Sequence, residues 1–510
     1  MSAHPFALPA HAAPPFTAVE ATVDGIHAAF RDGSLSCTSL VSACLARIAA
    51  YDREGPCLQA LITVHPQAME MAAAMDRQLR SGGGDFGPLF GIPVLLKDNF
   101  DTFDLPTTAG SVLFRDWQPA ADGFAVARMR RAGALVLGKT NLQELARGGI
   151  SLSSLGGQVR NPYDLTRTPG GSSGGTGAAL AASFAVLGTG SDTGQSIRSP
   201  ASANSLVGVR PTRGLVSRRG VMPNSFTQDE IGPLARTVTD AARLLDVMAG
   251  YDPQDPVTAL GVGRAPASYA KALDRQALGG ARIGIMSNLY GHEQRHAEVN
   301  RAMAQAEQGM AALGAVLIRF DLPEYAALAV QSNIERHEAG AALQRYLAQA
   351  GDAVPVRSLR EIAESHTATP AVQQALEAEL AMGDGLHAAD YKERLLNRER
   401  LRLAVLVRMA DLQLDAILYP LQRVLVACTG ETEQPERNGA LSHGTGLPAV
   451  NFPAGFSEPT ATAPLGVPVG AELLGRDFSE ARLLSLAYAY EQAWQPRRAP
   501  LATPPLGDGE

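Results

Sequence analysis

Two clusters of serine and glycine carry the hydroxyl groups that are most suited to chemistry in this chain. The first cluster spans residues 168–177 and includes Ser172, and the second spans residues 190–200 and includes Ser196. No histidine lies between residues 65 and 292. A serine nucleophile needs a base that takes its proton, so catalysis at these serines requires a base other than histidine.

Lys97 is the candidate base, because it ends the apolar run 92–96. Burial disfavours the charged form of a lysine and lowers its pKa, and a neutral amine can accept a proton. On its own, Lys97 would be interpreted as a lysine at a strand end that extends its ammonium group to water. Because the chain also contains two serine clusters with no histidine near them, we favour the interpretation of Lys97 as the base.

The spacing of the two clusters predicts that they meet. Ser172 and Ser196 are separated by a run of small residues that favours a helix over 177–184 and a strand over 185–188. A helix followed by a strand returns the chain to the same edge of a sheet. The alternative is a tight loop before a helix, but these glycines also allow a ligand to approach the backbone closely.

Residues 133–140 formally match the phosphate-binding pattern G-x-x-x-x-G-K-T. The four variable positions are Ala, Leu, Val and Leu, whereas a phosphate loop must expose backbone N–H groups in a turn. We therefore interpret this segment as a buried strand ending at Gly138.

The chain has 510 residues, of which 45% are hydrophobic and 19% are charged. This composition predicts a globular protein with a sizeable packed core. The net charge of −7 gives no indication of a positively charged surface that would bind nucleic acid or an anionic membrane. Four cysteines show no metal-ligand spacing and are expected to be reduced and mostly buried. The first fifteen residues lack the features of a signal peptide, and the apolar run 178–187 is too short to cross a bilayer. We expect a soluble cytoplasmic protein without metal, cofactor, nucleic-acid or membrane partners.

Strands and helices alternate along most of the chain, which predicts an α/β sheet covered by helices. Helices are expected within 19–76 and at 124–132, 142–146, 177–184, 238–248 (capped by Thr237 or Thr239), 298–313, 387–410 and 483–493. Strands are expected at 92–96, 135–137, 185–188, 282–286, 315–320, 415–419, 449–452 and 467–474. The expected organisation is a flexible lead-in at 1–17, a single domain at 18–500 with its core at about 90–240, a peripheral helical region at about 324–412, and a tail at 501–510.

Several spaced motifs resemble those of the amidase signature family, strongly over residues 25–250, more weakly over 441–495 and poorly over 255–440. They are Gly91-Ile-Pro-Val-Leu-Leu-Lys97-Asp98-Asn99, Leu105-Pro-Thr-Thr-Ala-Gly-Ser111, Gly138-Lys-Thr-Asn141, Arg167-Thr-Pro-Gly-Gly-Ser172-Ser173-Gly-Gly, Asp192-Thr-Gly-Gln-Ser196-Ile-Arg198-Ser-Pro-Ala201, Gly208-Val-Arg-Pro-Thr-Arg-Gly214, Gly232-Pro-Leu-Ala-Arg236, Thr445-Gly-Leu-Pro-Ala449 and Gly466-Val-Pro-Val-Gly-Ala-Glu-Leu-Leu-Gly475.

The resemblance implies a large mixed β-sheet with helices on both faces and a Ser-Ser-Lys catalytic triad. Ser196 would be the nucleophile, Ser172 the bridging serine after a cis peptide bond from Gly171, and Lys97 the final base.

The resemblance also implies an oxyanion hole made by the backbone N–H groups of Thr193, Gly194, Gln195 and Ser196. Ser173 would support the site by hydrogen bonding, and Asp192 and Arg198 would pair to brace the loop.

Gln195 departs from the family's usual Gly-Gly-Ser. Glutamine does not adopt positive φ as freely as glycine, so this position has negative φ or carries strain. The backbone N–H survives the change, and the side chain is free to line or brace the pocket.

Two functions follow from this resemblance. The first is a hydrolase of carboxylic amides, with esters and carbamates as further candidate substrates, that cleaves carbon–nitrogen bonds other than ordinary peptide bonds. The alternative is the glutamine-hydrolysing A subunit of a tRNA-dependent amidotransferase. A catalytically inactive scaffold is disfavoured, since every triad position is filled. The sequence identifies neither the substrate nor the oligomeric state, and a homodimer remains open.

Overall fold

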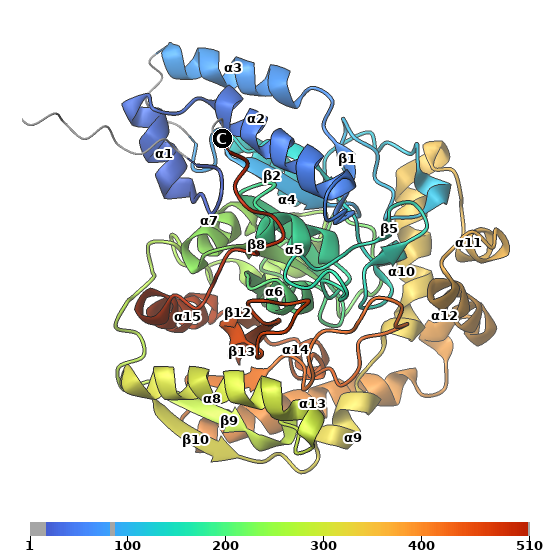
Figure 1. The fold of residues 1–510 in the computed structure, drawn as a ribbon. Helices are drawn as coiled ribbons and strands as arrows, with labels where there is room; N and C mark the ends of the chain where they lie inside the picture. Colours follow the sequence, from blue (N-terminus) through green and yellow to red (C-terminus); the bar gives the residue numbers. More distant parts are fainter. Residues whose placement is uncertain (1–16, 82–86, 508–510) are drawn as a thin grey trace, which may run out of the picture.

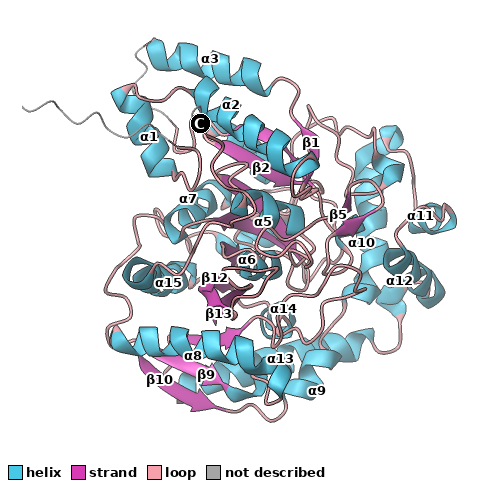
Figure 2. Ribbon diagram, viewed as in Figure 1, coloured by secondary structure: helices cyan, strands magenta, loops and turns pink. Residues whose placement is uncertain are grey.

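A mixed sheet of eleven strands runs through the centre of the molecule, and helices pack around it (Figures 1 and 2). The computed structural model describes residues 17–81 and 87–507. This architecture confirms the predicted α/β class. Of the predicted lead-in, residues 1–16 lie outside the described residues, as do the last three residues of the predicted tail.

The strands of the large sheet are β1 (Leu61–Val64), β2 (Pro93–Lys97), β3 (Leu135–Thr140), β6 (Leu187–Asp192), β7 (Val207–Arg210), β8 (Glu230–Ala235), β9 (Arg282–Met286), β10 (Val316–Phe320), β11 (Ala416–Pro420), β12 (Ala449–Phe456) and β13 (Pro468–Leu474). They are ordered β1-β3-β2-β6-β8-β7-β12-β13-β11-β9-β10. A small antiparallel pair is formed by β4 (Leu152–Ser153) and β5 (Gly157–Gln158).

The α-helices are α1 (Val23–Asp32), α2 (Cys37–Ile48), α3 (Ala68–Arg80), α4 (Phe124–Arg131), α5 (Gly174–Ala181), α6 (Arg198–Ala203), α7 (Val238–Met248), α8 (Ala297–Ala312), α9 (Tyr325–Gln331), α10 (Glu335–Ala350), α11 (Leu359–Glu364), α12 (Pro370–Met382), α13 (Tyr391–Asp411), α14 (Ala440–Thr445) and α15 (Glu480–Trp494). Short 3₁₀ or π segments lie at Ala49–Arg53, Val112–Phe114, Glu144–Ala146, Pro256–Gly261, Ser287–Leu289, Gln294–His296, Gly351–Ala353 and Gly385–His387.

The parallel pairing of β2 with β6 brings the lysine and the second serine cluster together. Val94 lies opposite Leu187, and Leu95 lies opposite Gly188. Because the carboxyl ends of parallel neighbours meet at the same edge of a sheet, Lys97 at the end of β2 lies close to Asp192 at the end of β6. The chain thus returns to the same edge of the sheet, as the spacing of the two serine clusters predicts.

The glycine-rich start of α5 is required by close packing. A Cβ atom on Gly175 would lie only 2.1 Å from the carbonyl oxygen of Asn141, and every residue of α5 is buried. A larger side chain would push the first serine cluster away from the sheet, so small residues at this position hold the cluster against β2 and β6.

Thr237 caps α7 by accepting a hydrogen bond from the backbone N–H of Asp240, so Thr237 is the observed cap of the two that were predicted.

The prediction of a helix from Leu142 to Ala146 is wrong. Leu145 and Ala146 have φ values of 53° and 57°, in the left-handed region. That backbone cannot continue a right-handed helix, so only the short segment Glu144–Ala146 forms.

The segment with the formal phosphate-loop pattern is a buried strand, as expected, but it continues beyond Gly138. Lys139 and Thr140 still pair with Leu96 and Lys97 of β2. The strand accommodates the Lys139 ammonium because the buried carboxylate of Asp98 lies 2.9 Å away.

The prediction that the cysteines are mostly buried is half right. Cys37 and Cys44 are buried, and both belong to the main apolar cluster of the molecule. Cys57 is half-buried and Cys428 is exposed. The two exceptions lie outside regular helices and strands, where packing covers less of the side chain.

Residues 325–411 contain helices α9 to α13, and their apolar side chains belong to clusters that are shared with neighbouring parts of the chain. Helices α10, α11 and α12 lie together at the right of Figure 1, and their core includes Leu343, Ile362 and Leu376. Within the described residues, no helix is both long and apolar enough to cross a membrane.

Replacing Lys139 by methionine is expected to lower the free energy of unfolding by about 3–5 kcal/mol, because Asp98 would remain buried without its cation. Urea unfolding followed by circular dichroism measures this change. The matched control is Arg360→Met, which breaks an exposed ion pair and is expected to cost about 0–1 kcal/mol. ATP binding by the wild type that Lys139→Met abolishes would contradict the strand interpretation.

Candidate functional site

The Lys97 amine is fully buried and lies among three oxygen atoms. Its Nζ lies 2.7 Å from Ser172 Oγ, 2.8 Å from Ser191 Oγ and 3.2 Å from the Ser191 carbonyl oxygen. The backbone N–H of Lys97 donates to Thr189 Oγ1 at 3.1 Å, which fixes the end of β2 against β6.

In its neutral form this amine has two N–H groups, which can donate to the two Ser191 oxygens, and one lone pair, which can face the Ser172 hydroxyl. Burial lowers the pKa of Lys97 to about 7, and the negative charges of Asp192 and Asp229 act in the opposite direction. The neutral form is therefore well populated near neutral pH, and its lone pair can accept the Ser172 proton.

Ser191 and Asn99 are site residues that sequence reasoning missed. The Asn99 side-chain amide donates to Ser191 Oγ at 3.0 Å and to the Met222 carbonyl at 3.1 Å. Ser191 is thereby held in position to accept from Lys97. Asn99 stands two residues after Lys97 in the first motif, and Ser191 directly precedes Asp192, so proximity to the motif residues was the available signal.

The two serine clusters are joined through their backbones. The peptide bond between Gly171 and Ser172 is cis. The backbone N–H of Ser173 donates to the Ser196 carbonyl at 3.2 Å, and the Ser173 hydroxyl donates to the Ser191 carbonyl at 3.4 Å. Ser196 is 7% exposed, and its hydroxyl makes no hydrogen bond to any described residue. Lys97, Ser172 and Ser196 thus share one edge of the sheet.

The loop before Ser196 presents its backbone N–H groups without partners. The carbonyl oxygens of residues 192–195 all accept hydrogen bonds, from Arg210, Gln228, Arg198 and Ser199 in turn. None of the N–H groups of residues 193–196 donates to a described residue. With its carbonyls held on one side, the loop offers a row of donors that suits a developing oxyanion.

A buried charge network holds this loop. Arg198 donates to both Asp192 oxygens at 3.0 and 3.2 Å and to Glu472 at 2.8 Å. Arg210 also lies 3.0 Å from Asp192. Burial on its own raises the pKa of the Asp192 carboxyl, but the two guanidinium groups hold it below its usual range. Asp192 is therefore charged, and the pair that sequence reasoning proposed is part of a larger network.

Gln195 has negative φ, so its backbone is unstrained. Its side chain is 3% exposed, and neither Oε1 nor Nε2 has a hydrogen-bond partner among the described residues. The side chain ends between two glycines: a Cβ on Gly439 would lie 3.4 Å from Gln195 Oε1, and one on Gly149 would lie 3.8 Å from Nε2. Gln195 therefore fills space beside the loop and does not brace it by hydrogen bonding.

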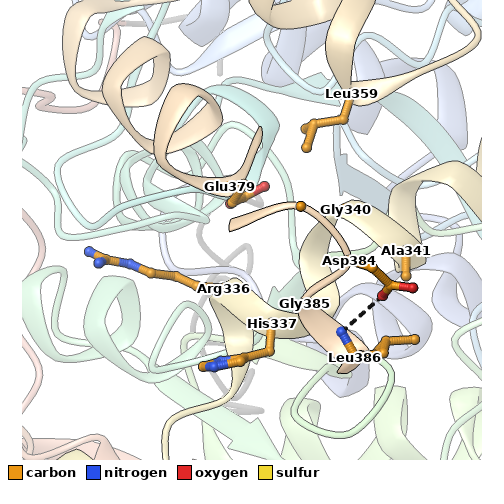
Figure 3. Close-up of a pocket in the computed structure, with 10 residues that line it drawn as sticks. Arg336, His337, Gly340, Ala341, Leu359, Glu379, Asp384, Gly385 and Leu386 are labelled. Carbon is orange, nitrogen blue, oxygen red and sulfur yellow. Dashed lines mark hydrogen bonds between the residues drawn. The ribbon is translucent and has the colours of Figure 1, made fainter. Parts of the chain in front are cut away.

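A separate cavity of about 310 Å³ lies in the peripheral helical region (Figure 3). Its lining residues come from α10, α11, α12 and the segment that follows α12, and they include His337, Glu379 and Asp384. None of the predicted site residues lines it. In the part of the chain that the structure describes, no cluster of three or more His, Cys, Asp or Glu side chains is arranged to hold a metal ion.

Comparisons with known proteins place this arrangement among its relatives. Residues 39–484 match the family described as Amidase. The chain is 36% identical over 476 residues to the A subunit of Glutamyl-tRNA(Gln) amidotransferase from Synechococcus sp. strain JA-2-3B'a(2-13), with 89% of each chain covered. The solved structure of a peptide amidase from Stenotrophomonas maltophilia superposes with a TM-score of 0.85 at 37% identity, covering 95% of this chain and 99% of that one. The same A subunit from Thermotoga maritima gives a TM-score of 0.72 at 28% identity, covering 93% and 95%.

The rate of any Lys97-dependent reaction is expected to fall about tenfold for each pH unit below about 7, since protonation removes the lone pair. The pH profile of kcat/KM measures this limb. Asp229→Asn removes a charge that raises the pKa of Lys97, so the limb should move to lower pH. Asp411→Asn, a change at the exposed last residue of α13, is the control and should leave it in place. A limb near pH 10 in the wild type would contradict the buried neutral amine.

Gln195→Gly is expected to retain activity, because the backbone N–H remains. Gln195→Leu is expected to be at least as stable as the wild type, since a buried amide without a partner costs about 1–3 kcal/mol. Urea unfolding and kcat/KM on the same preparations measure both effects. A folded Gln195→Gly variant without activity would show that the side chain is essential.

Proposed function

Because this chain belongs to the amidase family and acts on carbon–nitrogen bonds, we propose that it hydrolyses carboxylic amides through an acyl-enzyme on Ser196. The observation that carries the proposal is the buried Lys97 amine at 2.7 Å from Ser172 Oγ, beside a loop of unpartnered N–H groups. No histidine takes part in this arrangement.

In the first half-reaction, Ser196 Oγ attacks the amide carbonyl carbon and forms a C–O bond. Its proton passes to Ser172 Oγ while the Ser172 proton passes to the Lys97 lone pair. The carbonyl oxygen becomes an oxyanion and accepts hydrogen bonds from the N–H groups of residues 193–196. Ser172 and Ser196 share no direct hydrogen bond here. Catalytic hydrogen bonds commonly tighten only when substrate is bound.

The tetrahedral intermediate then breaks its C–N bond. The proton held by Lys97 returns through Ser172 to the leaving nitrogen, which departs as a neutral amine or ammonia. An ester on Ser196 remains. Water attacks this ester with the same relay as general base, the carboxylic acid leaves, and Ser196 regains its proton. Each half-reaction begins and ends with a neutral Lys97.

Residues around the triad have supporting roles in this scheme. Asp192 and Arg198 fix the loop that carries the oxyanion donors, and Ser191 with Asn99 orients the Lys97 amine. Ser173 links the two clusters through its contacts with the backbones of Ser196 and Ser191.

The proposed substrate is a small molecule with a carboxylic amide, cleaved by this chain without partner subunits in the cytoplasm. The peptide amidase superposes over nearly all of its length and resembles this chain more than the Thermotoga maritima protein does, which favours the amide of a peptide as the substrate. The alternative is a glutamine-hydrolysing A subunit, which the curated amidotransferase relatives support. Such a chain would require partner subunits.

The purified chain is expected to release the chromophore from a chromogenic anilide and ammonia from amino-acid amides. Ser196→Ala should lower kcat at least about 10⁴-fold, because it removes the nucleophile. Ser199→Ala, a neighbouring buried serine outside the relay, is the matched control and should retain most activity. Hydrolysis that appears only with glutamine and added amidotransferase subunits would favour the alternative. Full activity of Ser196→Ala would refute the acyl-enzyme.

A further inference from the structure

Gln228 is a fully buried glutamine just before β8, and its side-chain amide has a partner for each of its hydrogen-bonding positions. Its Oε1 accepts from the backbone N–H of Ile334 at 2.8 Å and from Arg398 Nη1 at 3.3 Å. Its Nε2 donates to the Thr193 carbonyl oxygen at 3.2 Å and lies 3.3 Å from His443 Nδ1. An amide that uses both of its hydrogens and both of its lone pairs is held in one orientation.

The partners of Oε1 decide which way this amide faces. The oxygen and the nitrogen of a glutamine amide exchange places when the group turns over. A backbone N–H and a guanidinium group only donate, so the atom that faces Ile334 and Arg398 must be the oxygen. The two N–H groups therefore point to the Thr193 carbonyl oxygen and to His443. Burial lowers the pKa of His443 well below its usual value, so the ring is neutral and its Nδ1 can accept.

The hydrogen bond to the Thr193 carbonyl sets the direction of the next N–H group. The peptide unit between Thr193 and Gly194 is trans, and a trans unit is planar with its C=O and N–H on opposite sides. Holding the carbonyl toward Gln228 therefore aims the Gly194 N–H at the opposite side, where the row of unpartnered donors lies.

Packing gives this peptide unit little support on its glycine side. Apart from the chain neighbours of Gly194, no heavy atom of a described residue lies within 4 Å of the point where a Cβ on Gly194 would be. The other three carbonyl oxygens of the loop accept from two arginines and from a backbone N–H. Gln228 supplies the remaining bond with a neutral side chain, and its further partners belong to α13, to α14 and to the residue before α10.

We propose that Gln228 is a positioning residue for the hydrolysis, because it holds the Gly194 N–H toward the oxyanion that forms on the substrate carbonyl. Gln228 does not touch the reacting atoms and acts through the peptide unit between Thr193 and Gly194. Without its hydrogen bond this peptide unit can turn, and its N–H then leaves the row of donors. This role rests on the proposed acyl-enzyme on Ser196, since the oxyanion forms only in that reaction.

The first test is the kinetics of Gln228→Met, which keeps the length of the side chain and removes its amide. Removing one donor of an oxyanion hole costs about 10²- to 10³-fold in kcat, and a misdirected donor costs less. We expect kcat to fall about 10- to 100-fold while KM changes less than about threefold, because the oxyanion is absent from the bound substrate. Rates are compared on the plateau above the Lys97 limb, so that a shift of that limb does not count as a loss.

Two further variants make this measurement specific. Gln228→Glu, in its ionised form, still accepts from Ile334 and Arg398 but cannot donate to Thr193, so it should show the same loss and serves if Gln228→Met does not fold. Gln373→Met is the matched control. Gln373 is half-buried on α12 and its Nε2 donates to the Ala363 carbonyl at 2.8 Å, so this variant loses a similar bond far from the loop and should retain the wild-type kcat.

A trifluoromethyl ketone separates the positioning of the donor from general damage to the fold. Ser196 Oγ adds to the ketone carbon and forms a C–O bond, the Ser196 proton passes through Ser172 to Lys97, and the ketone oxygen becomes an oxyanion. A ¹³C label at the ketone carbon reports the pH at which this oxygen is protonated. That pH is expected to rise by about one unit in Gln228→Met, which corresponds to a tenfold weaker stabilisation of the oxyanion. Gln373→Met should titrate like the wild type.

The outcomes separate this role from the proposed function. A folded Gln228→Met or Gln228→Glu variant with the kcat of the wild type, or with an unshifted titration of the adduct, would overturn the positioning role and leave the acyl-enzyme intact. A wild type that neither hydrolyses amides nor forms the ketone adduct would overturn the acyl-enzyme, and the positioning role with it. Circular dichroism of each variant shows that the compared proteins are folded.

Discussion

The burial of the Lys97 amine is the constraint on which the rest of the site depends. An ammonium group without a counter-charge is costly in a protein interior, and the three nearest partners of Lys97 are neutral oxygens from Ser172 and Ser191. The two carboxylates that influence it, Asp192 and Asp229, belong to other hydrogen-bonded groups. The amine is therefore free to exchange a proton near neutral pH. A second buried lysine shows the contrast: Lys139 has Asp98 at 2.9 Å, and its pair serves packing between β2 and β3.

The arrangement of charges around Asp192 explains how a flexible sequence of small residues becomes a rigid row of donors. Arg198 and Arg210 bind the Asp192 carboxylate, and they also reach the backbone carbonyls of Gly194 and Asp192. Fixing the carbonyls on one side leaves the N–H groups of residues 193–196 without protein partners. The charged side chains of Asp192, Arg198 and Arg210 thereby position the backbone N–H dipoles of the loop. In the proposed mechanism, this arrangement separates the two requirements of acyl transfer, which are a neutral base for the nucleophile and oriented donors for the oxyanion.

Much of the fold, and the meeting of Lys97 with the two serine clusters, was predictable because the signals are local. The apolar run before Lys97, the small residues of α5 and the glycine clusters each indicate one element. Strand β2 and helix α5 formed within three residues of the predicted positions, whereas β6 begins two residues later than the strand predicted at 185–188 and continues to Asp192. Contacts between distant segments were not predictable from one sequence. Strand β8 contains Gly232 and Pro233 and showed no strand signal, although it pairs with β6. The left-handed backbone at Leu145 and the partners of Asp192 from β7 and β13 depend on tertiary packing. The roles of Ser191 and Asn99 became visible only when β2 and β6 were placed side by side.

The ionisation of Lys97 itself is the most direct test of this account. The chain has only four lysines, so protein labelled with ¹³C at the lysine ε-carbon gives four resonances, and single Lys→Arg variants at positions 271 and 392 assign the exposed pair. The account predicts that one buried resonance titrates with a midpoint near pH 7 and that this resonance is the one lost in Lys97→Met. A Lys97 resonance that stays in the ammonium form up to about pH 10, as an ordinary lysine does, would contradict the neutral base on which the mechanism depends.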